Sequence, residues 1–144
     1  MRIKHGNITL ETVVARQRSK GLEIKLSSFD QAVALKEPNR KVSSSLLVLT
    51  QKIAMQVNDE STLSKTSDIL DIGVLAYLLL SDVTQNDASE IRTVLSCCQD
   101  KETIFQGGQW HKVSRECKEL ISLMIDEDPR QRLSVDQAMA HPWF

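Results

Sequence analysis

Two short apolar segments near the start of the chain are separated by a polar stretch. Residues 22–26 alternate strictly between apolar and charged side chains, which is the period of a strand with one face buried. Val13 and Val14 precede them, and the intervening residues 16–21 are polar and end in a glycine. We therefore expect a small β-hairpin with a half-buried face, in which Gly21 adopts a positive φ.

The next part of the chain carries less apolar surface. Residues 36–45 are rich in charged residues and serine, so we expect a mobile surface loop there. An alternative is that the serines at 43–45 accept phosphate. Residues 46–57 are apolar without a clear period, and residues 58–65 return to turn-forming polar side chains.

The second half of the chain has the periodicity of helices. Residues 68–80 are apolar on nearly every helical face after the first turn, so this helix should lie in the centre of the domain. Residues 87–98 begin with capping-box spacing and continue as an amphipathic stripe. Ser114 can cap a third helix, and Ser134 with Gln137 repeats the capping box for a fourth. The third helix has an apolar stripe formed by Cys117, Leu120, Ile121, Met124 and Ile125.

These patterns predict a mainly α fold, in which helices surround one buried central helix and a short β-hairpin lies near the N-terminus. The chain has 144 residues, 41% of them apolar, which is enough for one compact domain. Aromatic residues make up 4% and there are 5 glycines, which disfavours a turn-rich β-sandwich.

Charge and hydropathy exclude two classes of partner. The formal net charge of -1 gives no field that would attract a phosphate backbone or an anionic membrane. No apolar run reaches the roughly 20 residues that cross a bilayer. We therefore expect neither nucleic-acid nor membrane binding.

The cysteines indicate the compartment. There are 3, an odd number, and Cys97 and Cys98 are adjacent, which argues against a disulfide framework and lacks the ligand spacing of a zinc site. The first residues, 1–5, contain no apolar core of a signal peptide. We expect an intracellular, cytoplasmic protein without a metal site.

The end of the chain carries more specific motifs. Residues 117–121, 128–134 and the closing His141-Pro142-Trp143 resemble the end of a Ser/Thr protein kinase domain, in the manner of the calcium/calmodulin-dependent and calcium-dependent kinases. Residues 67–74 resemble the central helix of that family, which is written D-[VI]-W-S-x-G-[VI]. The resemblance extends over residues 1–144, as a partial domain that consists of the C-terminal lobe only and lacks the N-terminal lobe.

This resemblance places residues 5–12 at the catalytic loop and residues 28–30 at the D-F-G segment of the family. The catalytic aspartate is then replaced by Asn7, which is a neutral amide without useful basicity. The loop lysine is replaced by Thr9, which removes a charge that steadies the transferred phosphoryl group.

The two positions at which the family binds magnesium also differ. Thr12 replaces the asparagine and Ser28 replaces the D-F-G aspartate, so the resemblance predicts that metal ligation is lost. Asp30 lies two positions further on, but magnesium tolerates misplaced ligands poorly, and we do not expect a rescue.

Other positions of the family pattern are structural. His5 and Asp68 match residues that brace the backbone of the catalytic loop. Gln56 replaces a glutamate that forms a buried ion pair with an arginine matching Arg132. Because an unpaired buried charge is costly, we expect Arg132 to meet the amide oxygen of Gln56 or a nearby carboxylate.

The resulting hypothesis is a pseudokinase: not an enzyme, without cofactor because ATP and magnesium binding are lost, and acting by interaction with or regulation of a protein partner. The alternative is a Ser/Thr protein kinase fragment that retains ATP binding or atypical phosphotransfer when an N-lobe completes it. A third hypothesis is an incomplete fragment of a larger pseudokinase.

Overall fold

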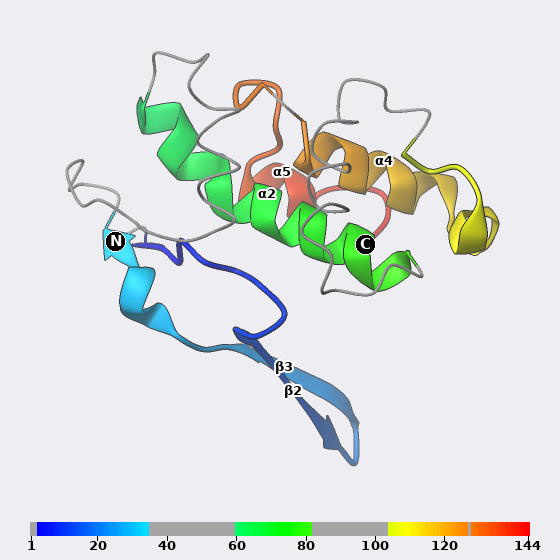
Figure 1. Cartoon of the computed structure of the whole chain (residues 1–144), viewed down its shortest axis with the longest axis horizontal. Coiled ribbons are helices and arrows are strands. Elements are labelled where there is room, and N and C mark those ends of the chain that lie inside the picture. The colour runs from blue at the N-terminus through cyan, green and yellow to red at the C-terminus, as the bar shows by residue number, and fades with distance from the viewer. Residues whose placement is uncertain (1–2, 35–59, 82–103, 127) are drawn as a thin grey trace.

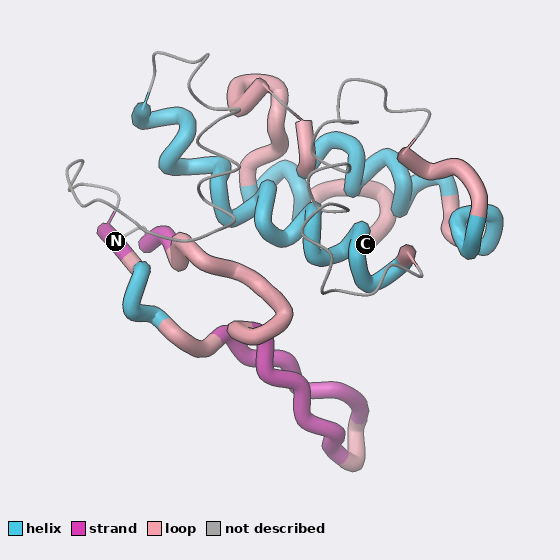
Figure 2. The backbone as a smooth tube through the Cα atoms, in the orientation of Figure 1, coloured by secondary structure: helices cyan, strands magenta, loops and turns pink. Residues whose placement is uncertain are grey.

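The computed structural model describes residues 3–34, 60–81, 104–126 and 128–144. Figure 1 shows the α-helices packed together and a hairpin that extends away from them, and Figure 2 shows a short helical turn apart from the α-helices, next to the short strands near the N-terminus. In chain order, the strands are β1 (Ile3–Lys4), β2 (Val13–Arg18), β3 (Gly21–Leu26) and β4 (Val33–Ala34). The α-helices are α2 (Glu60–Leu80), α4 (Arg115–Met124) and α5 (Val135–Met139), and the 3-10 helices are η1 (Phe29–Gln31) and η3 (Gly108–Lys112).

The predicted hairpin is present as β2 and β3, with strands longer than expected. The ladder pairs Val13 with Leu26 at its base and Arg18 with Gly21 at its tip, which leaves a turn of Ser19 and Lys20. Gly21 has the expected positive φ, at 130°. The predicted half-buried face is wrong, because Leu22 is 60% exposed and Ile24 is 61% exposed.

A second sheet was not predicted from the sequence. β1 and β4 pair antiparallel, with Ile3 opposite Ala34 and Lys4 opposite Val33. Each strand has two residues, which is too short for an alternating pattern to be recognised. The pairing closes a loop of chain, so that both ends of residues 3–34 lie side by side in Figure 1.

The central helix begins earlier than predicted. α2 starts at Glu60 and not at Asp68, so the turn expected for residues 58–65 is wrong over 60–65. Residues 60–67 contain neither proline nor glycine, and a helix that is already packed can propagate into such a segment.

α2 and α4 approach closely at one glycine. A Cβ atom on Gly73 would lie 2.7 Å from Cγ2 of Ile125 and 2.8 Å from Cβ of Met124. Any larger side chain at position 73 would therefore force the two segments apart.

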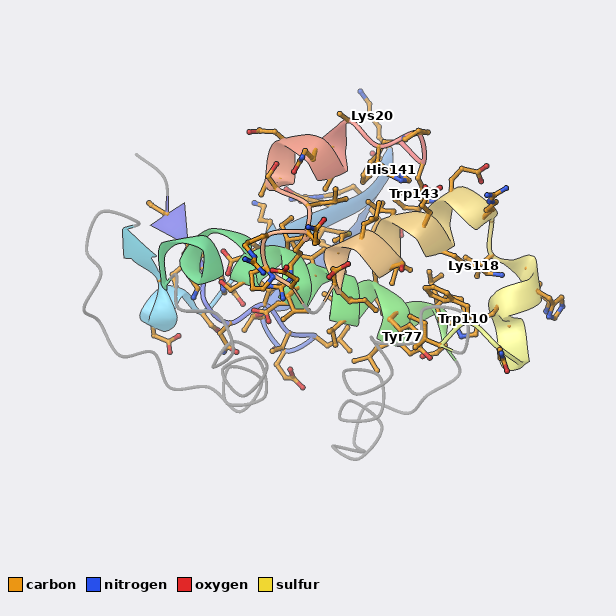
Figure 3. The ribbon with its side chains drawn as sticks, turned by 90° about the horizontal axis from the view of Figure 1, so that it is seen from above. Lys20, Tyr77, Trp110, Lys118, His141 and Trp143 are labelled. Carbon is orange, nitrogen blue, oxygen red and sulfur yellow. The ribbon has the colours of Figure 1, made fainter. Side chains whose placement is uncertain are left out.

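The main core lies along α2, α4 and the segment around η3. The ring of Tyr77 lies 4.9 Å from that of Trp110, and Figure 3 shows the two side chains next to each other. The Tyr77 hydroxyl donates a hydrogen bond of 2.8 Å to the carbonyl oxygen of Ile104, which satisfies its buried polar atom. The buried members of this core are Leu70, Val74, Tyr77, Leu78, Ile104, Trp110, Cys117, Ile121 and Ile125.

The two predicted helix starts near the C-terminus are confirmed. Ser114 Oγ accepts a hydrogen bond from the backbone N–H of Cys117, which caps α4. Ser134 and Gln137 form the reciprocal capping box of α5. All five residues of the apolar stripe predicted for the third helix are buried.

Some expectations fall on residues that are not described. The loop at 36–45, the serines at 43–45, the apolar segment 46–57 and the helix at 87–98 lie outside the described residues, as do Gln56, Cys97 and Cys98. Within the described ranges, no helix is long and apolar enough to cross a membrane.

Candidate functional site

The loop that runs from residue 5 to residue 12 lies against α2. The carboxylate of Asp68 accepts two hydrogen bonds from the loop backbone, 2.7 Å from the N–H of His5 and 2.9 Å from the N–H of Gly6. Hydrogen bonds to a charged acceptor are among the stronger ones in proteins. The start of the loop is therefore attached firmly to the central helix, at the two positions that the sequence assigned to bracing it.

A second carboxyl group from α2 lies one turn further along. Asp71 is 5% exposed, and its Oδ2 accepts a hydrogen bond of 3.4 Å from the N–H of Ile8. Burial, the largest cause, raises the pKa of this carboxyl from 3.8 to about 7. Sequence analysis missed this group, because an acidic residue inside an apolar helix gave no indication of what would cover it.

His5 connects the loop to the end of the hairpin. Its Nδ1 accepts a hydrogen bond of 3.4 Å from the N–H of Asn7, so its Nε2 carries the proton and donates to the carbonyl oxygen of Ser27 at 2.9 Å. The imidazole is buried and lies 4.7 Å from the ring of Phe29, measured between ring centroids. The side chain therefore joins two backbone segments.

Thr12 closes the loop by binding its backbone. Its hydroxyl oxygen accepts a hydrogen bond of 2.9 Å from the N–H of Thr9. The same hydroxyl donates its proton to the carbonyl oxygens of Asn7 and Thr9, each 3.0 Å away. The side chain is buried. The hydroxyl that stands at the family's metal position is thus used in the turn itself.

The remaining predicted positions lie nearer the surface. Asn7 and Thr9 are half-buried, and Ser28 is exposed. A hydrogen bond from the Thr9 side chain lowers the pKa of Glu11, an exposed carboxylate beside Thr12 that sequence analysis did not consider.

Ser28 has an unusual backbone conformation. Its φ of 61° and ψ of 57° are left-handed, and it is the one non-glycine residue with a positive φ in the described ranges. Such a conformation costs about 1–2 kcal/mol for a residue with a Cβ. The strain lies at the first residue of the segment that the sequence aligned with D-F-G, two positions before the exposed Asp30.

Arg132 is held by a backbone oxygen. Its Nε and Nη2 donate hydrogen bonds of 3.0 and 2.9 Å to the carbonyl of Asp126, and the side chain is buried. The pairing with Gln56 concerns a residue outside the described ranges and stays a prediction. No group of three or more His, Cys, Asp or Glu side chains that could hold a metal ion is found among the described residues.

Known proteins similar to this chain are protein kinases. The model of the protein kinase domain family matches residues 1–144. Calcium-dependent protein kinase 33 of Arabidopsis thaliana is 24% identical over 144 residues, which are 100% of this chain and 27% of that protein. Calcium/calmodulin-dependent protein kinase cmkA of Emericella nidulans is 26% identical over 99% of this chain and 34% of its own length. The human myosin light chain kinase family member 4 is 29% identical over 100% of this chain and 36% of its own length.

The solved structures agree on the fold. The structure of the Rad53 kinase domain with SCD2 aligns with 98% of this chain at a TM-score of 0.64 and 19% identity. The alignment covers 49% of that chain. The present chain therefore spans about half of that structure and about a quarter to a third of the curated relatives.

These matches confirm the resemblance to calcium-dependent and calcium/calmodulin-dependent kinases and correct one prediction. The expectation that the chain is not an enzyme was drawn from the side chains at Asn7, Thr9, Thr12 and Ser28. It is wrong, because the family model and all three relatives are those of phosphate-transferring enzymes.

Proposed function

The chain belongs to the protein kinase domain family, and we propose that it forms the C-terminal lobe of such a domain and acts through contact with another protein. The observation that carries this proposal is the exposed apolar face of the β2–β3 hairpin. Residues that are directly opposite in an antiparallel ladder share one face of the sheet. The face in question consists of Val13, Ala15, Gln17, Leu22, Ile24 and Leu26, and we call it the hairpin face.

The hairpin face is unusually apolar for an exposed surface. Leu22, Ile24 and Leu26 follow one another on β3 with large exposed fractions. Exposed side chains of this kind that are contiguous on one face are typical of a protein interaction site. An edge of a two-stranded sheet also offers unpaired backbone groups to a further strand.

The opposite face of the hairpin is mainly basic. Arg18 lies 2.7 Å from the carboxylate of Glu23, and Lys25 lies 3.3 Å from it, while Arg16 stands opposite Glu23 in the ladder. Three cations around one anion leave a positive surface. This charge supports a partner segment with acidic residues at the edge of its apolar contact.

We further propose that the chain by itself holds no magnesium ATP. Magnesium takes oxygen ligands and in phosphate-transfer sites is bound through carboxylates, whereas Thr12 and Ser28 offer neutral hydroxyls. The Thr12 hydroxyl is already occupied by the loop backbone. The side chains of Thr12 and Ser28 therefore do not fit a magnesium ion.

A second candidate function is protein phosphotransfer once an N-lobe completes the domain. It is supported by the relatives, which are all named as kinases, and by the attachment of the loop to Asp68. In that case the added half would supply the Gly-rich loop and the lysine that hold the phosphates, whereas the family's magnesium positions remain Thr12 and Ser28 of this chain.

One experiment separates these functions. The 144-residue chain is titrated by calorimetry with an amphipathic peptide that carries acidic residues beside its apolar face. A mixture of the chain with a separately produced N-terminal half of a kinase domain is assayed for transfer of labelled phosphate to a basic protein. We expect binding that Ile24→Asp weakens at least tenfold and that Leu79→Asp leaves unchanged. Leu79 is a matched control, because it is 61% exposed, as is Ile24, but lies on α2.

The outcomes differ for each proposal. Equal binding by both variants contradicts the hairpin face as the contact. Phosphate transfer by the mixture establishes the second candidate. A thermal melt of the chain alone with magnesium ATP at a hundredfold excess over a typical Kd should not move, since binding would add about 2.7 kcal/mol and raise the Tm by several degrees.

A further inference from the structure

The two carboxyl groups that α2 directs at the loop are not equivalent. Asp68 binds two backbone N–H groups at 2.7 and 2.9 Å, with both oxygens in use. Asp71 binds one, at 3.4 Å, through Oδ2. A buried carboxylate with a single long hydrogen bond is poorly compensated for the loss of its water.

The loop is what separates Asp71 from solvent on its side. Ile8, whose N–H reaches Asp71, is itself buried. On the helix, Leu70 and Gly73 face the packed interior, whereas Ile72 is 37% exposed. Moving residues 5–12 away from α2 would therefore hydrate the carboxyl group.

The charges around Asp71 come from three segments. Lys4 on β1 and Arg132 in the segment before α5 favour the carboxylate, whereas Asp68, one turn earlier on α2, opposes it. Arg132 directs its Nε and Nη2 to the carbonyl of Asp126. The His5 ring, the remaining titratable group of the loop that is buried, faces Ser27 and Asn7. Burial outweighs the two cations, which places the pKa of Asp71 at about 7.

We propose that Asp71 is a positioning residue whose proton controls the docking of loop 5–12 on α2. The protonated carboxyl group lies under the docked loop without an unsolvated charge. Loss of the proton leaves a buried carboxylate that is stabilised when the loop opens and water enters. Opening of the loop is thus linked to release of one proton.

Loop 5–12 holds the family's catalytic-loop positions, on which the second candidate function, phosphotransfer, depends. Asn7, Thr9 and Thr12 all lie in it, so a partner or substrate that needs the docked loop would bind more weakly as the pH rises toward 7. That consequence rests on the second candidate function, whereas the link between loop opening and proton release does not, and this link is tested without a partner.

The test is amide hydrogen exchange of the 144-residue chain, followed by NMR between pH 5 and pH 8. We expect the protection factor of the Ile8 N–H to fall by up to about tenfold per pH unit and to level off above pH 7, because one proton is released on opening. In Asp71→Asn, which cannot ionise, the protection factor should be constant. Asp136→Asn, on the exposed surface of α5, should behave as the unmodified chain does.

A substitute variant and two further NMR signals distinguish opening of the loop from misfolding, from titration of His5 and from global unfolding. Asp71→Ser serves if Asp71→Asn does not fold, and the His5 ring protons are followed in the same samples so that its titration is separated. The N–H of Ile121, in α4, reports unfolding of the whole domain. A constant protection factor for Ile8 in the unmodified chain overturns the proposal, as does an equal fall in Asp71→Asn. Protection of Ile8 equal to that of Ile121 at every pH also overturns it, because the loop would then open only with global unfolding.

Discussion

The helical body and the β2–β3 hairpin use similar apolar residues with opposite results. In α4, Ile121 is 2% exposed against α2, whereas Ile24 of the hairpin is 61% exposed. Both residues belong to a regular apolar pattern that predicts a buried face. An apolar pattern therefore indicates which face of a helix or strand is more stable when buried. Whether that face is buried within the chain depends on the neighbouring segments.

The largest expected change in stability distinguishes the core of the helical body from the hairpin. Ile121→Ala removes a fully buried side chain and should lower the free energy of unfolding by about 2–5 kcal/mol. Ile24→Ala removes the same atoms from an exposed position and should change it by less than about 0.5 kcal/mol. Urea denaturation followed by circular dichroism measures both. Equal losses would mean that the hairpin face is buried in solution.

The second expected change is a pH dependence of stability that comes from a buried carboxyl group of the helical body. The folded pKa of Asp71, about 7, lies above its ordinary value of 3.8, so the folded state holds an extra proton between these values. Stability from this group is complete below about pH 4 and is lost as the pH rises through 7, by on the order of 4 kcal/mol. Thermal melts of Asp71→Asn should lack this component, and a pH profile identical to that of the unmodified chain would contradict the buried location of Asp71.

A smaller change in stability tests how closely α2 packs against the end of α4 at Gly73. Gly73→Ala places a Cβ atom 2.7 Å from Ile125 and should destabilise the domain by about 1–2 kcal/mol, even though alanine favours helices. The double variant with Ile125→Ala should recover part of that loss, with a coupling above about 0.5 kcal/mol. Strict additivity in urea denaturation would show that the two helices do not meet at this glycine.

The smallest effect lies where the hairpin returns to the body. Ser28→Gly relieves a left-handed serine and should leave stability unchanged or raise it by about 0.5 kcal/mol, because relief of strain exceeds the entropy cost of glycine. Ser27→Gly is the matched control, since it removes the hydrogen bond from the Ser27 hydroxyl to the carbonyl of Thr12 and should destabilise by about 1 kcal/mol. Destabilisation by Ser28→Gly equal to that of the control would argue against strain at this position.

Much of the fold followed from local sequence signals. The caps at Ser114 and Ser134, the apolar stripe of α4 and the hairpin with Gly21 at its turn are set by residues within a few positions of one another. Such interactions act within one turn or one ladder rung, so they are the same in any surroundings. The motifs at the end of the chain indicated the family for the same reason, because they are contiguous.

The candidate site was predicted less completely. The family resemblance indicated that His5 and Asp68 brace the backbone of the loop, and the structure adds that the Asp68 carboxylate binds the N–H of His5 itself. It did not indicate that Asp71 would lie under Ile8, that Arg132 would bind a carbonyl group, or that the Thr12 hydroxyl would close the turn. Each of these depends on an atom brought from a distant segment or on a loop conformation without periodicity.

The sequence by itself determined the class of the domain, the starts of α4 and α5 and the pairing of β2 with β3, because these result from short-range hydrogen bonding and periodicity. Only the tertiary structure decided which apolar faces are covered, how far α2 extends and which carboxyl group is buried. How much of a side chain is buried depends on all the segments that pack around it, including those distant in sequence. The free energy of an apolar or charged side chain depends in turn on how much of it still contacts water.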